Sequence, residues 1–267
     1  MGLPPGRHRE VKNKGSRRGA RLALKLLSPH FGAKSIPVRN LKQMAFFPKL
    51  GLTLNRLQKN GSSTAVGFLY FLENGDQVEP NYAKEQTTHL SELGIAGVAK
   101  LLSTKKLVIV RDPYSRLLSA FLNKFRTRHY QQAFGPFDLS PSGFRQFLLF
   151  LDRGGLRANS HWSPQSDRLL LPHDGYDYVL SFNAFPSKLV QKLDEWIPGA
   201  ARKWEEFSIA ETSGPPATRA LDNLSAFYSR NEAVMVERLF RDDFEVPQIR
   251  EQARVAMHAL GQEIRFD

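Results

Sequence analysis

The chain has 267 residues, of which 41% are hydrophobic and 24% are charged, a composition typical of a folded soluble protein. It contains no cysteine, which excludes disulfides, thiolate metal sites and cysteine nucleophiles. No run approaches the roughly 18 consecutive apolar residues of a membrane-spanning helix, and the amino-terminal segment lacks the apolar centre of a signal peptide. From these features we expect a cytoplasmic protein.

The net charge of +12 is concentrated at the amino terminus, where residues 1–25 carry eight Lys or Arg and one acid, Glu10. Such an arm has little apolar surface to bury, so we expect it to be disordered and separate from a folded domain of residues 26–267. The alternative is that it contacts an anionic surface, such as RNA, DNA or lipid headgroups. The charge of the remaining chain is too small to indicate a nucleic-acid-binding surface.

The first ordered unit predicted by the sequence is a strand, a turn and a helix. Leu52–Leu57 has an imperfect strand alternation and is followed by the turn-forming pair Asn60-Gly61. A helix then begins at Ser62 or Ser63, either of which can cap it, and ends at Asn74-Gly75.

A second unit follows, with a helix predicted from Ser91 and a strand at Lys106–Val110. The β-branched run KLVIV is typical of a strand buried on both faces. Asp112-Pro113 supplies an N-cap and a first-turn proline for the next helix. That helix extends to Phe125, because apolar residues recur at i, i+3, i+4 and i+7.

The rest of the chain continues this alternation. It predicts a helix over Ser142–Leu151, a strand at Tyr176–Phe182, a helix near Pro186–Trp196 and a last helix over Glu232–Phe240. Strands separated by helices predict an α/β fold, a single P-loop-like domain with a central parallel sheet flanked by helices.

The segment LQKNGSSTA, Leu57–Ala65, lies where a strand passes into a helix. Gly61 lets the backbone approach a ligand closely, and free N–H groups at a helix start attract an anion. Lys59 adds a full charge, and Ser62, Ser63 and Thr64 add hydroxyl donors. These features favour phosphate binding, although an ordinary capped turn would explain the segment as well.

A second candidate segment is VRDPYSRLLSAFLNKF, which begins at Val110. Arg111 stands at the carboxyl end of a predicted strand, where open α/β sheets bind ligands, and its guanidinium suits a phosphate. Ser115, Ser119 and Arg126 line one polar strip of the helix, so Arg111 and Ser119 can hold a second anion. The alternative is that Arg111 pairs with a surface acid and Ser119 fills a polar flank.

Together these segments resemble the sulfotransferases that use 3′-phosphoadenosine-5′-phosphosulfate (PAPS), in particular the carbohydrate branch, sulfotransferase family 2. QKNGSST is similar to the family's Pro-Lys loop, with Gln58 in place of proline, and the second segment matches the family signature closely. HWSPQ (His161–Gln165), YDYVLSF and RLFRDDFE also resemble family stretches, so the likeness spans about residues 50–245. One departure is Asn183, where relatives often carry glutamate, and another is that we expect no membrane anchor of the kind typical of Golgi members.

The resemblance implies transfer of a sulfuryl group from PAPS to a hydroxyl, on a glycan acceptor, without a metal. It implies that the loop binds the 5′-phosphosulfate through Lys59, Asn60, Gly61, Ser62, Ser63 and Thr64. It also implies that Arg111 and Ser119 bind the 3′-phosphate. Lys59 is then the group placed to stabilise charge on the leaving oxygen.

Two other classes of protein share some of these features. A nucleotide kinase should carry a Walker A motif, but here Lys59 precedes the glycine. A basic nucleic-acid-binding module would explain the arm, yet no recognised nucleic-acid motif is present and the paired segments stay unexplained.

The general base has two histidine candidates. His161 lies in HWSPQ, and His89 lies in TTHL, where related hexuronic-acid sulfotransferases place a catalytic histidine. Glu85, or no single base, remains open, and so does a purely structural His161 that orders its own loop. Trp162 either stacks on a sugar ring or is a buried aromatic that holds the loop.

Overall fold

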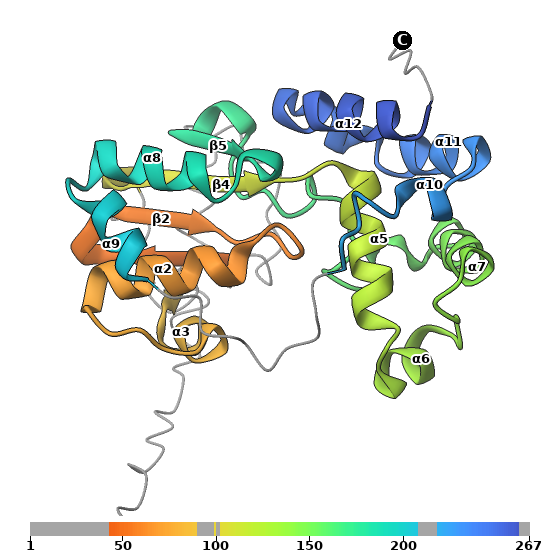
Figure 1. Cartoon of the computed structure of the whole chain (residues 1–267), viewed down its shortest axis with the longest axis horizontal. Coiled ribbons are helices and arrows are strands. Elements are labelled where there is room, and N and C mark those ends of the chain that lie inside the picture. Colours follow the sequence, from red (N-terminus) through yellow and green to blue (C-terminus); the bar gives the residue numbers. More distant parts are fainter. Residues whose placement is uncertain (1–42, 90–98, 100–101, 208–217, 262–267) are drawn as a thin grey trace, which may run out of the picture.

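The computed structural model of the chain describes residues 43–89, 99, 102–207 and 218–261 (Figure 1). The predicted arm of residues 1–25 and the domain boundary at residue 26 lie outside this part, and both stay predictions. The helix predicted from Ser91 also lies outside it, except for Ala99 and Leu102, which are helical.

The described residues form a mixed α/β fold around a five-stranded sheet of order β3-β1-β2-β4-β5. The strands are β1 Met44–Phe47, β2 Leu52–Asn55, β3 Thr88–His89, β4 Lys105–Val110 and β5 Tyr178–Ser181. β2, β4 and β5 run parallel, as predicted, and β1 runs antiparallel to its neighbours β2 and β3. The predicted parallel sheet is therefore confirmed for β2, β4 and β5, and β1 adds an antiparallel strand that the sequence did not predict.

β4 is buried on both faces, as the run KLVIV predicts. Leu107 and Ile109 pack in the hydrophobic cluster on one face, while Val108 and Val110 pack in the cluster on the other. Helices therefore cover both faces of the sheet. The first cluster includes residues of α2 (Ser62–Asn74), α3 (Pro80–Gln86), α8 (Ser187–Trp196) and α9 (Ala200–Glu206). The second includes residues of α5 (Pro113–Lys124), α6 (Arg128–Phe134), α7 (Pro141–Asp152), α10 (Leu224–Phe227), α11 (Arg230–Leu239) and α12 (Pro247–Ala259).

The two helices that follow β2 and β4 begin in different ways. Asp112 caps α5 by accepting a hydrogen bond from Ser115 N at 2.7 Å, with Pro113 in the first turn, as predicted. The N-cap of α2 is Gly61, with φ 71°, and no side chain caps this helix. The prediction of a Ser62 or Ser63 cap was wrong, because the left-handed Gly61 starts the helix without a hydroxyl acceptor.

The other predicted elements are present with small shifts in their ends. The strand predicted over Leu52–Leu57 ends at Asn55, and the helix predicted over Glu232–Phe240 is α11. A capping box between Ser229 and Glu232 starts α11 two residues early. The prediction that this helix is the last was wrong, because α12 follows after the short 3₁₀ helix η6, Arg241–Glu245.

The sheet places the ends of β2 and β4 together. The two strands are parallel and hydrogen-bonded, so the loop into α2 and the start of α5 emerge side by side. Figure 1 shows α5 leaving the end of β4 and extending away from the sheet. Among the helices of the described residues, none has the length and apolar character needed to cross a membrane.

Candidate functional site

A cleft of about 660 Å³ opens where β2 and β4 end. Its walls come from the loop before α2 and the first turn of that helix, from α3 and α5, and from three segments later in the chain. The lining residues are Gln58, Lys59, Gly61, Ser62, Ser63, Thr64, Lys84, Arg111, Ser119, Asn123, Lys124, His161, Phe182 and residues 218–222. Eight of the ten predicted site residues are among them. The other two, Asn60 and His89, do not line the cleft.

The loop of residues 58–64 (the anion loop) has a strained backbone. Lys59 has φ 68° although it is not glycine, and Gly61 has φ 71°. A Cβ on Gly61 would lie 2.9 Å from the Phe185 ring, so glycine is required by conformation and by space. No side chain caps α2, so the first backbone N–H groups of this helix have no capping acceptor. This end of the helix lines the cleft.

Arg111 is buried at the floor of the cleft, with 7% of its surface exposed. Its Nη1 donates to Lys59 O at 3.0 Å, its Nε donates to Ser115 Oγ at 2.9 Å, and the guanidinium lies 4.3 Å from the Phe182 ring centroid. Burial lowers the pKa of Arg111. The alternative of pairing with a surface acid was wrong, since this guanidinium holds the anion loop against the end of β4.

Ser119 lies on α5 facing the segment of residues 218–222. Its Oγ accepts a hydrogen bond from Thr218 Oγ1 at 3.1 Å. One turn further along α5, Asn123 and Lys124 also line the cleft, whereas Arg126 of the predicted polar strip is exposed beyond the helix end. The i+4 spacing from Ser119 would have identified Asn123 from the sequence.

Positive charge gathers in the cleft with little to balance it. Burial and the nearby Lys124, Arg111, Arg116 and Lys84 lower the pKa of Lys59 to about 7. Lys84 donates from Nζ to Ser63 Oγ at 2.5 Å, and burial lowers its pKa too. Asp222 is the one acid among the described lining residues. An anionic ligand would relieve this repulsion, so the cleft is built for one.

His161 lines the same cleft and is neutral at pH 7. Burial and the cations Lys124 and Lys59 lower its pKa to about 3. The Oδ1 atom of Asn159 lies 3.0 Å from His161 N, a donor, and 2.7 Å from Nδ1. An oxygen that already accepts from the backbone is an acceptor, so Nδ1 carries the proton and Nε2 is the basic nitrogen.

The second histidine candidate lies elsewhere. His89 is in β3 opposite Ala45, at the edge of the sheet, and is not among the lining residues of the cleft. Glu85 is exposed on α3 and does not line it either. Among the candidates for the base, the structure brings His161 into the cleft.

Trp162 is fully buried, and its Nε1 donates to Gly155 O at 3.0 Å. Its ring packs against Phe125, Phe134 and Phe147. The prediction that it stacks on a sugar was wrong, and the alternative of a buried aromatic that holds the loop is right.

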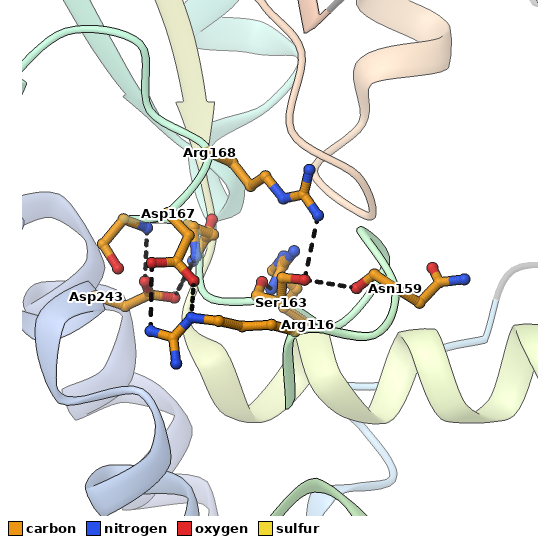
Figure 2. A network of polar contacts seen from close by, with 9 residues as sticks. Arg116, Asn159, Ser163, Asp167, Arg168 and Asp243 are labelled. Atoms are coloured by element: carbon orange, nitrogen blue, oxygen red, sulfur yellow. Dashed lines mark hydrogen bonds and ion pairs between the residues drawn. The ribbon is translucent and has the colours of Figure 1, made fainter. Parts of the chain in front are cut away.

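Sequence reasoning gave no role to Arg116, which is fully buried beneath the anion loop. Its Nε donates to Gln58 O at 3.1 Å and its Nη1 to Ser163 O at 3.0 Å, and burial lowers its pKa to about 10. Ser163 in turn contacts Asn159 and Arg168 (Figure 2). The HWSPQ segment is therefore tied to the anion loop.

Among the described residues, no three His, Asp or Glu side chains are grouped as in a metal site.

The sequence matches the Sulfotransferase family over residues 42–246, which is most of the chain. The chain belongs to this family. Two relatives that it resembles are human and mouse carbohydrate sulfotransferase 14. Each is 36% identical over 107 residues, which cover 34% of this chain and 28% of the relative. No solved structure matches the chain significantly. The family match ends at residue 246, just before α12.

Proposed function

We propose that the chain transfers a sulfuryl group from PAPS to a hydroxyl of a carbohydrate. The observation that carries this proposal is the meeting of two anion-binding elements on one cleft, the anion loop and the pair Arg111 and Ser119. Family membership supports sulfuryl transfer. The carbohydrate acceptor is inferred from the names of the two relatives.

The residues present fit a donor with two separate anionic groups. Lys59, the hydroxyls of Ser62, Ser63 and Thr64, and the start of α2 would hold the 5′-phosphosulfate. Arg111 and Ser119 would hold the 3′-phosphate. The lowered pKa of Lys59 supports this fit, because burial lowers it and the neighbouring cations Lys124 and Arg111 lower it further.

In the proposed reaction, the acceptor oxygen forms a bond to sulfur while the bond from sulfur to the 5′-phosphate oxygen breaks. Lys59 stabilises the negative charge that grows on that leaving oxygen, and this contribution is largest in the transition state. His161 Nε2 accepts the hydroxyl proton, and Asn159 keeps the ring in the tautomer that allows this.

Binding of adenosine 3′,5′-bisphosphate, the expected product, tests the proposal. It should raise the melting temperature, and at about 100 times its Kd the gain in stability is about 2.7 kcal/mol. Labelled sulfate should then pass from PAPS to members of a glycan panel. If ATP or an oligonucleotide stabilises the protein and the bisphosphate does not, the protein is a nucleotide kinase or a nucleic-acid-binding module instead.

A further inference from the structure

Gln165, the last residue of HWSPQ, is fully buried directly beneath the cleft. Its Oε1 accepts from Asn60 Nδ2 at 2.7 Å and from Arg111 N at 3.1 Å. Its Nε2 donates to Arg111 O at 2.7 Å and to Asp243 Oδ2 at 3.2 Å. The amide therefore uses both acceptor positions and both donor protons, which is its full capacity.

The contacts with Arg111 settle which way this amide faces. Arg111 N is a donor and Arg111 O is an acceptor, so the oxygen and nitrogen of Gln165 cannot exchange places. The amide pairs with both backbone groups of one residue, as a neighbouring strand would. This holds the backbone of Arg111 where β4 ends and the side chain turns into the cleft.

The same amide holds the anion loop through Asn60. Asn60 is fully buried, and its Nδ2 donates to Ile109 O at 2.8 Å as well as to Gln165. Its Oδ1 has no hydrogen-bond partner among the described residues. Asn60 Oδ1 is thus buried without a hydrogen bond, while Asn60 Nδ2 keeps its hydrogen bonds to β4 and to Gln165.

Asp243, from η6, fixes Gln165 itself. Asp243 Oδ2 accepts from Gln165 N at 3.0 Å, and Oδ1 accepts from Ser166 N at 2.8 Å. This buried carboxylate belongs to the polar network drawn in Figure 2. Gln165 is therefore held at its backbone and at its amide, so it can act as a rigid spacer.

We propose that Gln165 is the positioning residue that sets the separation between the anion loop and Arg111. A ligand with two anionic groups gains from both sites at once only when the sites are held at the matching distance. Gln165 touches both elements and does not line the cleft, so it acts through them. The inference rests on the proposed function, since it assigns the two phosphates of the donor to these elements.

The test compares two nucleotides that differ by one phosphate. The 3′-phosphate bonus is defined as the Kd of adenosine 5′-monophosphate divided by the Kd of adenosine 3′,5′-bisphosphate. Calorimetry should show that Gln165→Met lowers this bonus about tenfold or more, the equivalent of about 1.4 kcal/mol. The Kd of the monophosphate should change much less, because each site persists while their separation is no longer held.

Gln252→Met is a matched control. Gln252 is also buried, and its Nε2 donates to Val110 O at 3.1 Å, one residue before Arg111, without contacting the anion loop. Both glutamine variants should lower the melting temperature, since both lose buried hydrogen bonds. If Gln165 has only a structural role, the 3′-phosphate bonus should be unchanged in both variants. If Gln165 is a positioning residue, the bonus should fall in Gln165→Met alone.

Asn60→Asp provides a second route if Gln165→Met does not fold. It removes both hydrogen bonds that Asn60 Nδ2 donates, to Gln165 and to Ile109 O, and leaves Gln165 in place, so it should also lower the 3′-phosphate bonus. An unchanged bonus in a folded Gln165→Met or Asn60→Asp protein overturns the proposal and leaves the proposed function standing. A wild-type protein that binds neither nucleotide overturns the proposed function instead.

Discussion

At the scale of single residues, Lys59 and Arg111 line one cleft and are expected to act at different stages. Lys59 serves an oxygen whose charge grows in the transition state, whereas Arg111 serves a phosphate whose charge is constant. Lys59→Ala should therefore lower kcat by about 100-fold or more when the donor is saturating. Arg111→Ala should weaken bisphosphate binding, and calorimetry with steady-state kinetics measures both effects.

Lys188→Ala is the control for these variants, because Lys188 is exposed on α8 and away from the cleft. It should alter neither quantity. Intact bisphosphate binding in Arg111→Ala would contradict the assignment of that residue to the donor.

The pH dependence of donor binding should report the charge of Lys59. Its pKa is about 7 in the free site, and a bound phosphate raises it, so binding above pH 7 requires uptake of a proton. Affinity for the bisphosphate should fall by up to about tenfold per pH unit from pH 7 to pH 9. Phosphate itself ionises near pH 6, below this range.

Lys59→Arg separates this effect from other ionisations. An arginine keeps its charge to a higher pH than a lysine, so the variant should bind with a flat profile between pH 7 and pH 9. A slope that persists in Lys59→Arg would assign the titration to another group.

His161 and His89 make a pair of variants with opposite expectations. His161→Ala should lower kcat by about 100-fold while bisphosphate affinity is retained, because His161 Nε2 is the basic nitrogen in the cleft. His89→Ala should change kcat little, since His89 does not line the cleft. If His161→Ala lost melting temperature and donor binding together, its role would be to order the loop.

The sequence pointed to Lys59 and Arg111 because residue type and position at a strand end suffice for a charged anion ligand. It could not reveal the state of His161. An unperturbed histidine titrates near pH 6.5, and here burial and Lys124 take the pKa to about 3. Lys124 comes from a distant element, so this shift exists only in the folded chain.

At the scale of elements, the sequence predicted helices whose capping residues and apolar spacing lie within one continuous segment. Asp112-Pro113 and the apolar spacing that follows were enough for α5. β1 was missed because MAFF is buried throughout and so has no alternation. α3 was missed because it has a single buried residue, Ala83, yet it brings Lys84 to the cleft. Tertiary contacts decide such short elements.

Gly61 tests whether the anion loop needs its unusual conformation. Gly61→Ala places a Cβ at φ 71° and 2.9 Å from the Phe185 ring. Left-handed backbone alone costs about 1–2 kcal/mol with a Cβ. The added clash should move the loop and weaken bisphosphate binding about tenfold or more, as calorimetry would show.

Gly75 supplies the control, because it ends the same helix at φ 80° with open space around it. Gly75→Ala should lower the free energy of unfolding by a similar strain and leave bisphosphate affinity unchanged. Equal affinity in both variants would show that the loop tolerates the displacement.

At the scale of the whole molecule, the residues that match the family end earlier in the chain than the residues that pack into the domain. The family match ends at residue 246, and the sequence placed its last helix at Glu232–Phe240. α12 nevertheless buries Ile249, Ala253 and Ala256 in the cluster on one face of the sheet. The sequence did not reveal α12, because its apolar positions are small or widely spaced among charges. The expected cytoplasmic location stays a prediction.

If α12 belongs to the folding unit, its buried face should contribute to the stability of the whole domain. Ile249 is fully buried, so Ile249→Ala should lower the free energy of unfolding by about 2–5 kcal/mol. Val255 lies on the same helix with 51% of its surface exposed, and Val255→Ala should change it by less than about 0.5 kcal/mol. Urea unfolding measures both variants. Two equally small changes would mean that the helix is an appendage, and the domain would then end where the family match does.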